Sequence, residues 1–131
     1  MKLFELRDAL VNMLEEATER VESRNLWSGE PSDVEQDKVF RVVINGATPF
    51  ERQRDPVLWR AAGLIDYRTT INVLDEAATA TAAYGELDTF VSALRSWVSE
   101  WSVEVTQAEV QPVGEDLVTT IRFRVMTMED A

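Results

Sequence analysis

The chain has 131 residues, a mass of 14.9 kDa and 45% hydrophobic residues, so we expect one domain over residues 1–131 with its own core. It contains neither cysteine nor histidine, which excludes disulfides, thiolate metal sites, a cysteine nucleophile and the usual general base near neutral pH. Its formal charge of −11, from 24 acidic and 13 basic residues, disfavours binding to nucleic acid and to anionic membranes.

The sequence carries no sign of export or of membrane insertion. Residues 1–8 mix charged and apolar side chains and lack the continuous apolar run of a signal peptide. No stretch approaches the roughly 18 consecutive apolar residues that mark a membrane-spanning helix. We therefore expect a protein of the cytoplasm with no membrane partner.

The first element in chain order is an amphipathic helix over residues 2–21. Apolar side chains recur there at steps of three and four residues, which places them along one stripe of a helix. Residues 22–38 are rich in serine, asparagine, proline and acids, and they are predicted to form a long loop. Connections of that length are usually functional or mobile.

Two strands are predicted next. Residues 38–44 are rich in β-branched side chains, and the turn signal Asn45-Gly46 is expected to end that strand. Residues 47–60 contain two prolines and are predicted to be a long irregular segment. Residues 64–73 alternate apolar and polar side chains, which is typical of an antiparallel strand with one buried face.

A second helix and two more strands complete the chain. Residues 75–84 are rich in alanine and threonine, and their composition leaves open whether they extend the helix or lead flexibly into it. The apolar stripe over residues 86–101 predicts the second amphipathic helix. Residues 103–110 and 117–127 are predicted strands that are joined by a turn at Gly114.

The predicted order is therefore helix, strand, strand, helix, strand, strand. Helices with one apolar stripe and strands with one apolar face must cover each other. We expect an α+β two-layer sandwich with both helices on one face of a four-stranded, mainly antiparallel sheet. The edge strands of such a sheet are open to pairing with a neighbour.

The charge is unevenly distributed along the chain. Residues 39–74 carry five arginines against three carboxylates, a net +2, whereas residues 75–117 carry one arginine against nine carboxylates, a net −8. A basic face and an acidic face on one chain suit head-to-tail self-association. Local ion pairing on the surface explains the same pattern equally well.

The motifs of common enzymes are missing from the sequence. The five glycines are too dispersed for a phosphate-binding loop, and there is no serine motif with a nearby lysine. Carboxylates alone could bind Mg²⁺ or Ca²⁺ or act as an acid–base pair, but they show no diagnostic spacing. We predict that the chain is not an enzyme and uses no cofactor.

Seven residues are predicted to make contacts with a partner, because arginine and tryptophan are common interface anchors. They are Arg52, Arg54, Trp59, Arg60, Arg68, Arg122 and Arg124. The alternative for Trp59 is that it folds back over the core. Trp97 and Trp101, four apart on the second helix, fit a core ridge better than an aromatic platform. Without a row of exposed aromatics, the arginine-bearing strands do not predict nucleic-acid binding.

The order and character of these elements resemble the tail-terminator proteins of long-tailed bacteriophages, the minor tail protein U group. The segments that carry the likeness are Leu3–Leu10, Phe40–Ile44, Tyr67–Leu74, Leu87–Val98 and Thr119–Val125. The resemblance implies a structural subunit without catalytic residues that forms a ring, commonly a hexamer, on the end of the tail tube. Its implied partners are further copies of itself, the tail tube protein and head-connector proteins, and its implied place is the virion tail, assembled in the bacterial cytoplasm.

Two other classes of protein remain open from the sequence. One is an acidic, dimeric binding module of the type III secretion chaperone kind, although such proteins usually end in a further helix. The other is a carboxylate-dependent enzyme.

Overall fold

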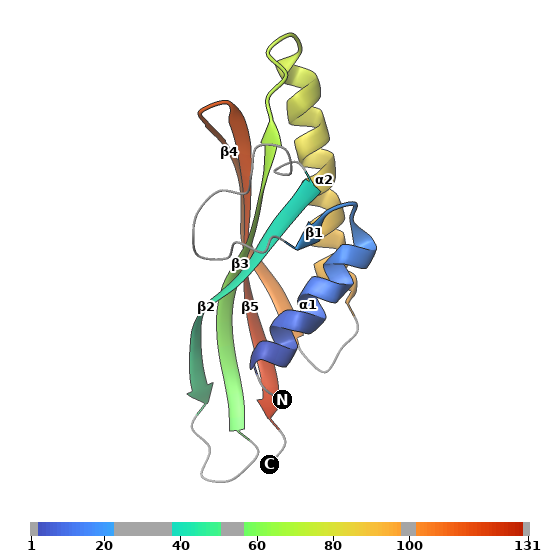
Figure 1. Cartoon of the computed structure of the whole chain (residues 1–131). Helices are drawn as coiled ribbons and strands as arrows, with labels where there is room; N and C mark the ends of the chain where they lie inside the picture. The colour runs from blue at the N-terminus through green and yellow to red at the C-terminus, as the bar shows by residue number, and fades with distance from the viewer. Residues whose placement is uncertain (1–2, 23–37, 51–56, 98–101, 130–131) are drawn as a thin grey trace.

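The computed structural model describes residues 3–22, 38–50, 57–97 and 102–129 (Figure 1). The described elements form an α+β fold with a sheet of strand order β1-β2-β3-β5-β4. In chain order they are α1 (Leu3–Ala17), β1 (Val21–Glu22), β2 (Val39–Phe50), β3 (Val57–Thr70), α2 (Glu76–Ser96), β4 (Ser102–Val113) and β5 (Asp116–Glu129).

The prediction of a four-stranded, mainly antiparallel sheet is wrong, because the sheet is five-stranded and mixed. The additional strand is β1, in which Val21 pairs in parallel with Val39 of β2. Helix α1 ends at Ala17, and the Thr18 hydroxyl donates to the Leu14 carbonyl at 2.8 Å. A strand of two residues shows no alternation of polar and apolar side chains, so the sequence pattern assigned Val21 to the helix instead.

The strands β2 and β3 form a longer hairpin than predicted. The register shifts between Ile44 and Gly46, so Asn45 is the extra residue of a β-bulge and β2 continues to Phe50. Residues 47–50 and 57–60 are therefore strand and not an irregular arm, and residues 51–56 lie outside the described residues. At the far end β3 stops at Thr70, and the predicted strand residues 71–73 lie in the connection to α2.

Helix α2 takes in the alanine- and threonine-rich segment whose structure the sequence left open. Asp75 is the N-cap, and its side chain accepts a hydrogen bond from the Ala78 backbone amide at 3.0 Å. The helix runs to Ser96, and Trp97 packs partly buried against the core. Trp101, the second residue of the predicted aromatic ridge, lies outside the described residues.

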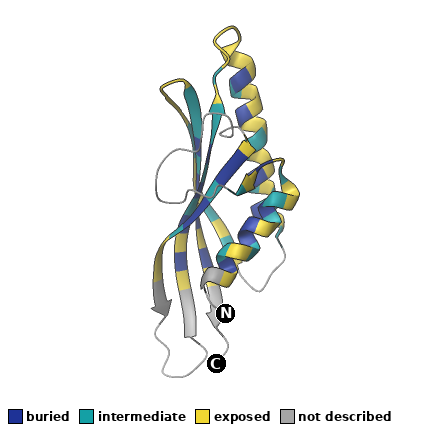
Figure 2. Ribbon diagram, in the orientation of Figure 1, coloured by how far each residue is buried: buried dark blue, intermediate teal, exposed yellow. Residues whose placement is uncertain are grey.

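The core lies between the sheet and both helices, which cover the same face (Figures 1 and 2). Phe90 of α2 stacks on Tyr67 of β3, with ring centroids 4.7 Å apart, and meets Phe40 of β2 edge-on at 5.7 Å. The other fully buried large side chains include Leu6, Leu10, Leu14, Ile65, Leu94, Ile121 and Phe123. Because both helices pack on this face, the opposite face of the sheet is not covered by any described helix.

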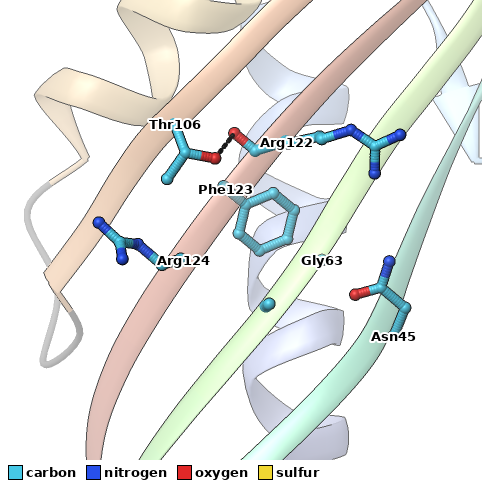
Figure 3. Close-up of a pocket in the computed structure, with 7 residues that line it drawn as sticks. Asn45, Gly63, Thr106, Arg122, Phe123 and Arg124 are labelled. Carbon is cyan, nitrogen blue, oxygen red and sulfur yellow. Dashed lines mark hydrogen bonds between the residues drawn. The ribbon is translucent and has the colours of Figure 1, made fainter.

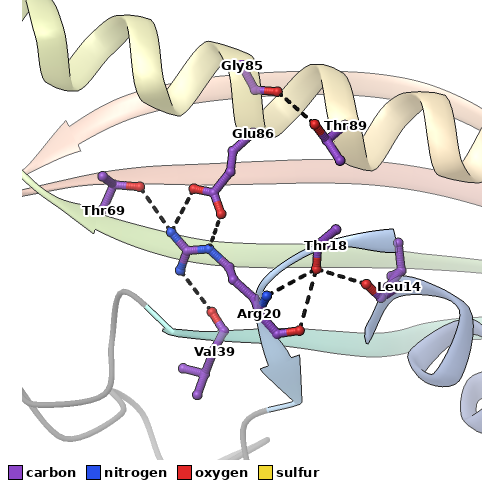
Figure 4. Close-up of polar contacts among 8 residues, drawn as sticks. All are labelled: Leu14, Thr18, Arg20, Val39, Thr69, Gly85, Glu86 and Thr89. Carbon is purple, nitrogen blue, oxygen red and sulfur yellow. Dashed lines mark hydrogen bonds and ion pairs between the residues drawn. The ribbon is translucent and has the colours of Figure 1, made fainter. Parts of the chain in front are cut away.

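A buried arginine joins four elements at the edge of this core (Figure 4). Arg20, 3% exposed, pairs with Glu86 of α2 through two hydrogen bonds and donates to the Val39 carbonyl at 3.0 Å. It also donates to the Thr69 hydroxyl at 3.2 Å and lies 4.5 Å from the centre of the Tyr67 ring. Arg20 lies in the segment predicted as the first helix, and no pattern in the sequence indicates this cluster.

Neither described helix is long and apolar enough to cross a membrane.

Candidate interaction surface

The sheet face that points away from α1 and α2 carries most of the polar side chains singled out from the sequence. In the β3–β5 register Ile65 lies opposite Ile121 and Gly63 opposite Phe123, which directs those residues toward the core. The alternate residues Leu64, Asp66, Arg122 and Arg124 therefore point to the other side. We call this side, formed by β2, β3, β5 and β4, the open face.

Three arginines of the open face pair with carboxylates of the same chain. Arg41 bonds to Asp66 through both its Nε, at 2.9 Å, and its Nη2. Hydrogen bonding to Asp66 raises the pKa of Arg41. Arg68 contacts Asp116 at 3.4 Å, and Arg124 contacts Glu104 at 3.0 Å. Local pairing thus accounts for part of the basic block at residues 39–74.

Arg122 differs from these three arginines. Its side chain is exposed, and no residue that the structure describes bonds to its guanidinium group. Figure 3 shows the Arg122 side chain extending across β3, whereas Arg124 extends toward β4. The Thr106 hydroxyl donates to the Arg122 carbonyl at 3.2 Å, which ties β4 to β5 beside it. Arg122 thus offers a guanidinium group to an anionic partner.

The open face is hollowed where β2 and β4 bulge. A first hollow of about 430 Å³ lies between Asn45 and Thr106, the bulge residues of β2 and β4, with Ala62, Arg122 and Arg124 in its lining (Figure 3). Bulges bend and twist a strand, which curves the sheet at this level.

Gly63 lines this hollow, and the packing around it leaves no space for a larger side chain. A Cβ atom on Gly63 would lie 2.5 Å from the Val43 carbonyl oxygen and 2.7 Å from the Phe123 ring. The ring of Phe123 thus packs directly against the backbone of β3.

A second hollow of about 510 Å³ lies further along the open face, toward the ends of β2 and β3 that lead into residues 51–56. We call it the end hollow. Small residues make room for it, and charged residues stand around it. Its lining includes Ala47, Arg60, Ala62, Glu104, Arg124 and Met126.

The structure brings together three of the seven predicted contact residues. Arg60, Arg122 and Arg124 line the two adjoining hollows. Arg68 lies near the opposite end of β3, where it pairs with Asp116.

The remaining predicted contact residues are not placed. Arg52 and Arg54 fall outside the described residues. Trp59 belongs to β3, but its side chain is not among those described, so neither interpretation of Trp59 is tested.

Sequence reasoning missed the residues that shape the hollows. Asn45-Gly46 was interpreted as the end of a strand, whereas Asn45 is a bulge inside one. Thr106 carried no local signal, because a bulge in an otherwise alternating strand depends on the register with its neighbour. Ala62 lines both hollows because β3 pairs with β2 and β5, and this pairing cannot be seen in the sequence around Ala62.

The chemistry of this face is that of a binding surface. It offers exposed guanidinium groups, small apolar residues and paired carboxylates, which can contact a macromolecule through ion pairs and apolar burial. Among the described residues no three acidic side chains gather closely enough to hold a metal ion. No protein-family model matches the chain, and no similar curated protein was found.

Proposed function

We propose that the chain is a structural subunit that associates with further copies of itself. The observation that carries this proposal is the open face, which presents exposed arginines and two adjoining hollows on a chain with a net charge of −11. An acidic surface of one copy is electrostatically attracted to the arginines of the next copy. Such a contact joins different surfaces of the two copies, and it closes into a ring when the rotation between them allows.

The ends of the long strands support the same proposal. The backbones of β2, β3 and β5 continue beyond the N-terminal end of α1, so no described helix covers this part of the sheet (Figure 1). Strand β4 is an edge strand of the sheet and has β5 as its one described neighbour. Uncovered sheet and open edges are the features through which β-sheet proteins bind partners.

Within this class we propose a tail terminator: a ring that caps a phage tail tube and joins it to the head. The tail tube protein and head-connector proteins are then its partners, and the virion tail is its location. The proposed assembly is non-enzymatic and needs no cofactor, because ring formation and capping require only complementary surfaces.

The test is tube assembly. The tail tube protein of the same genome is polymerised with and without this chain, and tube lengths and ends are examined by electron microscopy. We expect the chain at one end of each tube and an arrest of growth at that end. Tubes that keep growing and carry no chain at either end would refute the terminator assignment. Tail tube and tape-measure genes beside this gene would favour it.

A further inference from the structure

Two consecutive aliphatic side chains are almost fully exposed in the connection between β3 and α2. Val73 is 80% exposed and Leu74 is 92% exposed, the highest values among the exposed large hydrophobic residues of the described chain. We call this pair the apolar tip. It lies at one end of the molecule, beyond the end of β3 and next to the start of α2 (Figures 1 and 2).

The backbone around the apolar tip is held by a dense set of hydrogen bonds. The Asn72 side chain accepts from the Leu74 amide, and the Asn72 carbonyl accepts from the Asp75 amide, both at 3.0 Å. The Thr79 hydroxyl accepts from the Asn72 amide at 3.0 Å. A shape fixed before binding loses little conformational entropy on association.

The β4–β5 turn supports the tip from the other side. The Ile71 amide donates to the Glu115 carbonyl at 2.9 Å. Gly114, with φ of +62°, allows the two-residue turn that brings Glu115 there.

Three acidic residues lie close to the apolar tip along the chain or through the β4–β5 turn. Asp75 and Glu76 follow it directly in the sequence, and Glu115 is bonded beside it through its backbone. We call these three exposed acidic residues the acidic collar; the Asp75 carboxylate also accepts the Ala78 amide as the N-cap of α2. A partner site complementary to the tip must therefore combine apolar lining with basic residues.

The end hollow has that combination. Small and apolar residues make up most of its lining, which also contains Arg60, Arg124 and Glu104, the carboxylate that pairs with Arg124. Its volume of about 510 Å³ is ample for two aliphatic side chains, since a cavity of about 150 Å³ already accepts a benzene molecule.

The tip and the hollow of one molecule cannot meet each other. Arg60 lies ten residues before Thr70 on β3, which corresponds to about 33 Å along an extended strand. We propose that Val73 and Leu74 of one copy insert into the end hollow of the next copy, with the acidic collar against Arg60 and Arg124. This inference rests on the proposed self-association and names the surfaces that carry it.

Two variants on exposed positions separate the two halves of this interface. Val73→Ser with Leu74→Ser removes the tip, and Ala62→Phe fills the hollow without changing the charge. Each variant alone is expected to raise the dissociation constant at least about 30-fold, the effect of one interface hot spot. Thermal unfolding followed by circular dichroism verifies that both variants fold.

Mixing the two variants gives the decisive result, because the mixture can form one intact interface. The tip of the hollow-filled variant fits the hollow of the tip-deleted variant, so native mass spectrometry should show a one-to-one heterodimer and no larger species. A mixture that stays monomeric, or variants that assemble as the wild type does, would overturn the inference while leaving self-association standing. A wild-type chain that stays monomeric would instead refute the proposed function and this inference with it.

Discussion

At the scale of single residues, Gly63 has no room for a larger side chain. An alanine there would press against the Val43 carbonyl, which is part of the sheet backbone and cannot move aside. We expect Gly63→Ala to lower the free energy of unfolding by about 1–3 kcal/mol, the usual cost of overpacking. Urea denaturation measures the change.

Gly85 supplies the matched control for that prediction. It lies inside α2, and a Cβ atom on it would meet nothing within 4 Å. Gly85→Ala should therefore stabilise the protein by about 0.5–1 kcal/mol, because alanine is the better helix former. If both substitutions changed stability by the same amount and sign, the packing of Phe123 against Gly63 would be wrong.

The buried phenol of Tyr67 predicts how stability depends on alkaline pH. Burial raises the pKa of Tyr67, and the nearby Glu86 carboxylate adds to the rise. The unfolded chain then loses this proton near pH 10, before the folded protein does. The contribution of Tyr67 is complete below pH 10, and above it stability falls by about 1.4 kcal/mol for each pH unit until the folded pKa is reached.

Urea titrations at a series of alkaline pH values test this dependence. Tyr67→Phe should remove that part of the slope, and Tyr84→Phe, on the other tyrosine of the chain, is the matched control. An unchanged slope in Tyr67→Phe would contradict the assigned burial.

At the scale of elements, Arg20 fastens the end of α1 to β2, β3 and α2. Glu86→Ala would remove the carboxylate that accepts two hydrogen bonds from its buried guanidinium, and we expect a loss of about 3 kcal/mol in unfolding free energy. The double variant Arg20→Met with Glu86→Ala should be more stable than Glu86→Ala alone, because it also replaces the buried charge by an apolar side chain.

The exposed ion pair of the open face provides the control for the buried one. Arg124 and Glu104 have side chains that are 64% and 66% exposed, so Glu104→Ala should change stability by less than about 1 kcal/mol. Chemical denaturation of the wild type, the two single variants and the double variant measures these differences in unfolding free energy. A Glu86→Ala variant as stable as Glu104→Ala would show that the Arg20 cluster does not hold these elements together.

Long, strongly patterned elements could be predicted from the sequence, and short or register-dependent ones could not. The stripe through Leu6, Leu10 and Leu14 and the alternation through Ile121, Phe123 and Val125 both mark buried faces, as predicted. Strand β1 is too short to carry a pattern. The continuation of β2 beyond Asn45 depends on a bulge that only pairing with β3 reveals.

At the scale of the whole molecule, the sequence predicts that arginines lie on the polar faces of strands, but it does not predict which of them lie close together in the fold. Arg60 and Arg124 share the end hollow because β3 and β5 pair in a particular register. The same pairing brings Arg68 to a carboxylate partner of β5, Asp116. The excess of acidic residues in 75–117 includes the acidic collar close to Val73 and Leu74, which lies at the opposite end of β3 from the end hollow.

The central claim is that the chain assembles with further copies of itself. Sedimentation velocity of the full chain over a wide range of concentration tests it most directly. We predict that the sedimentation coefficient rises with concentration and levels off at one value, as expected for a closed assembly of fixed subunit number. A coefficient that stays at the monomer value over the whole range would contradict the claim.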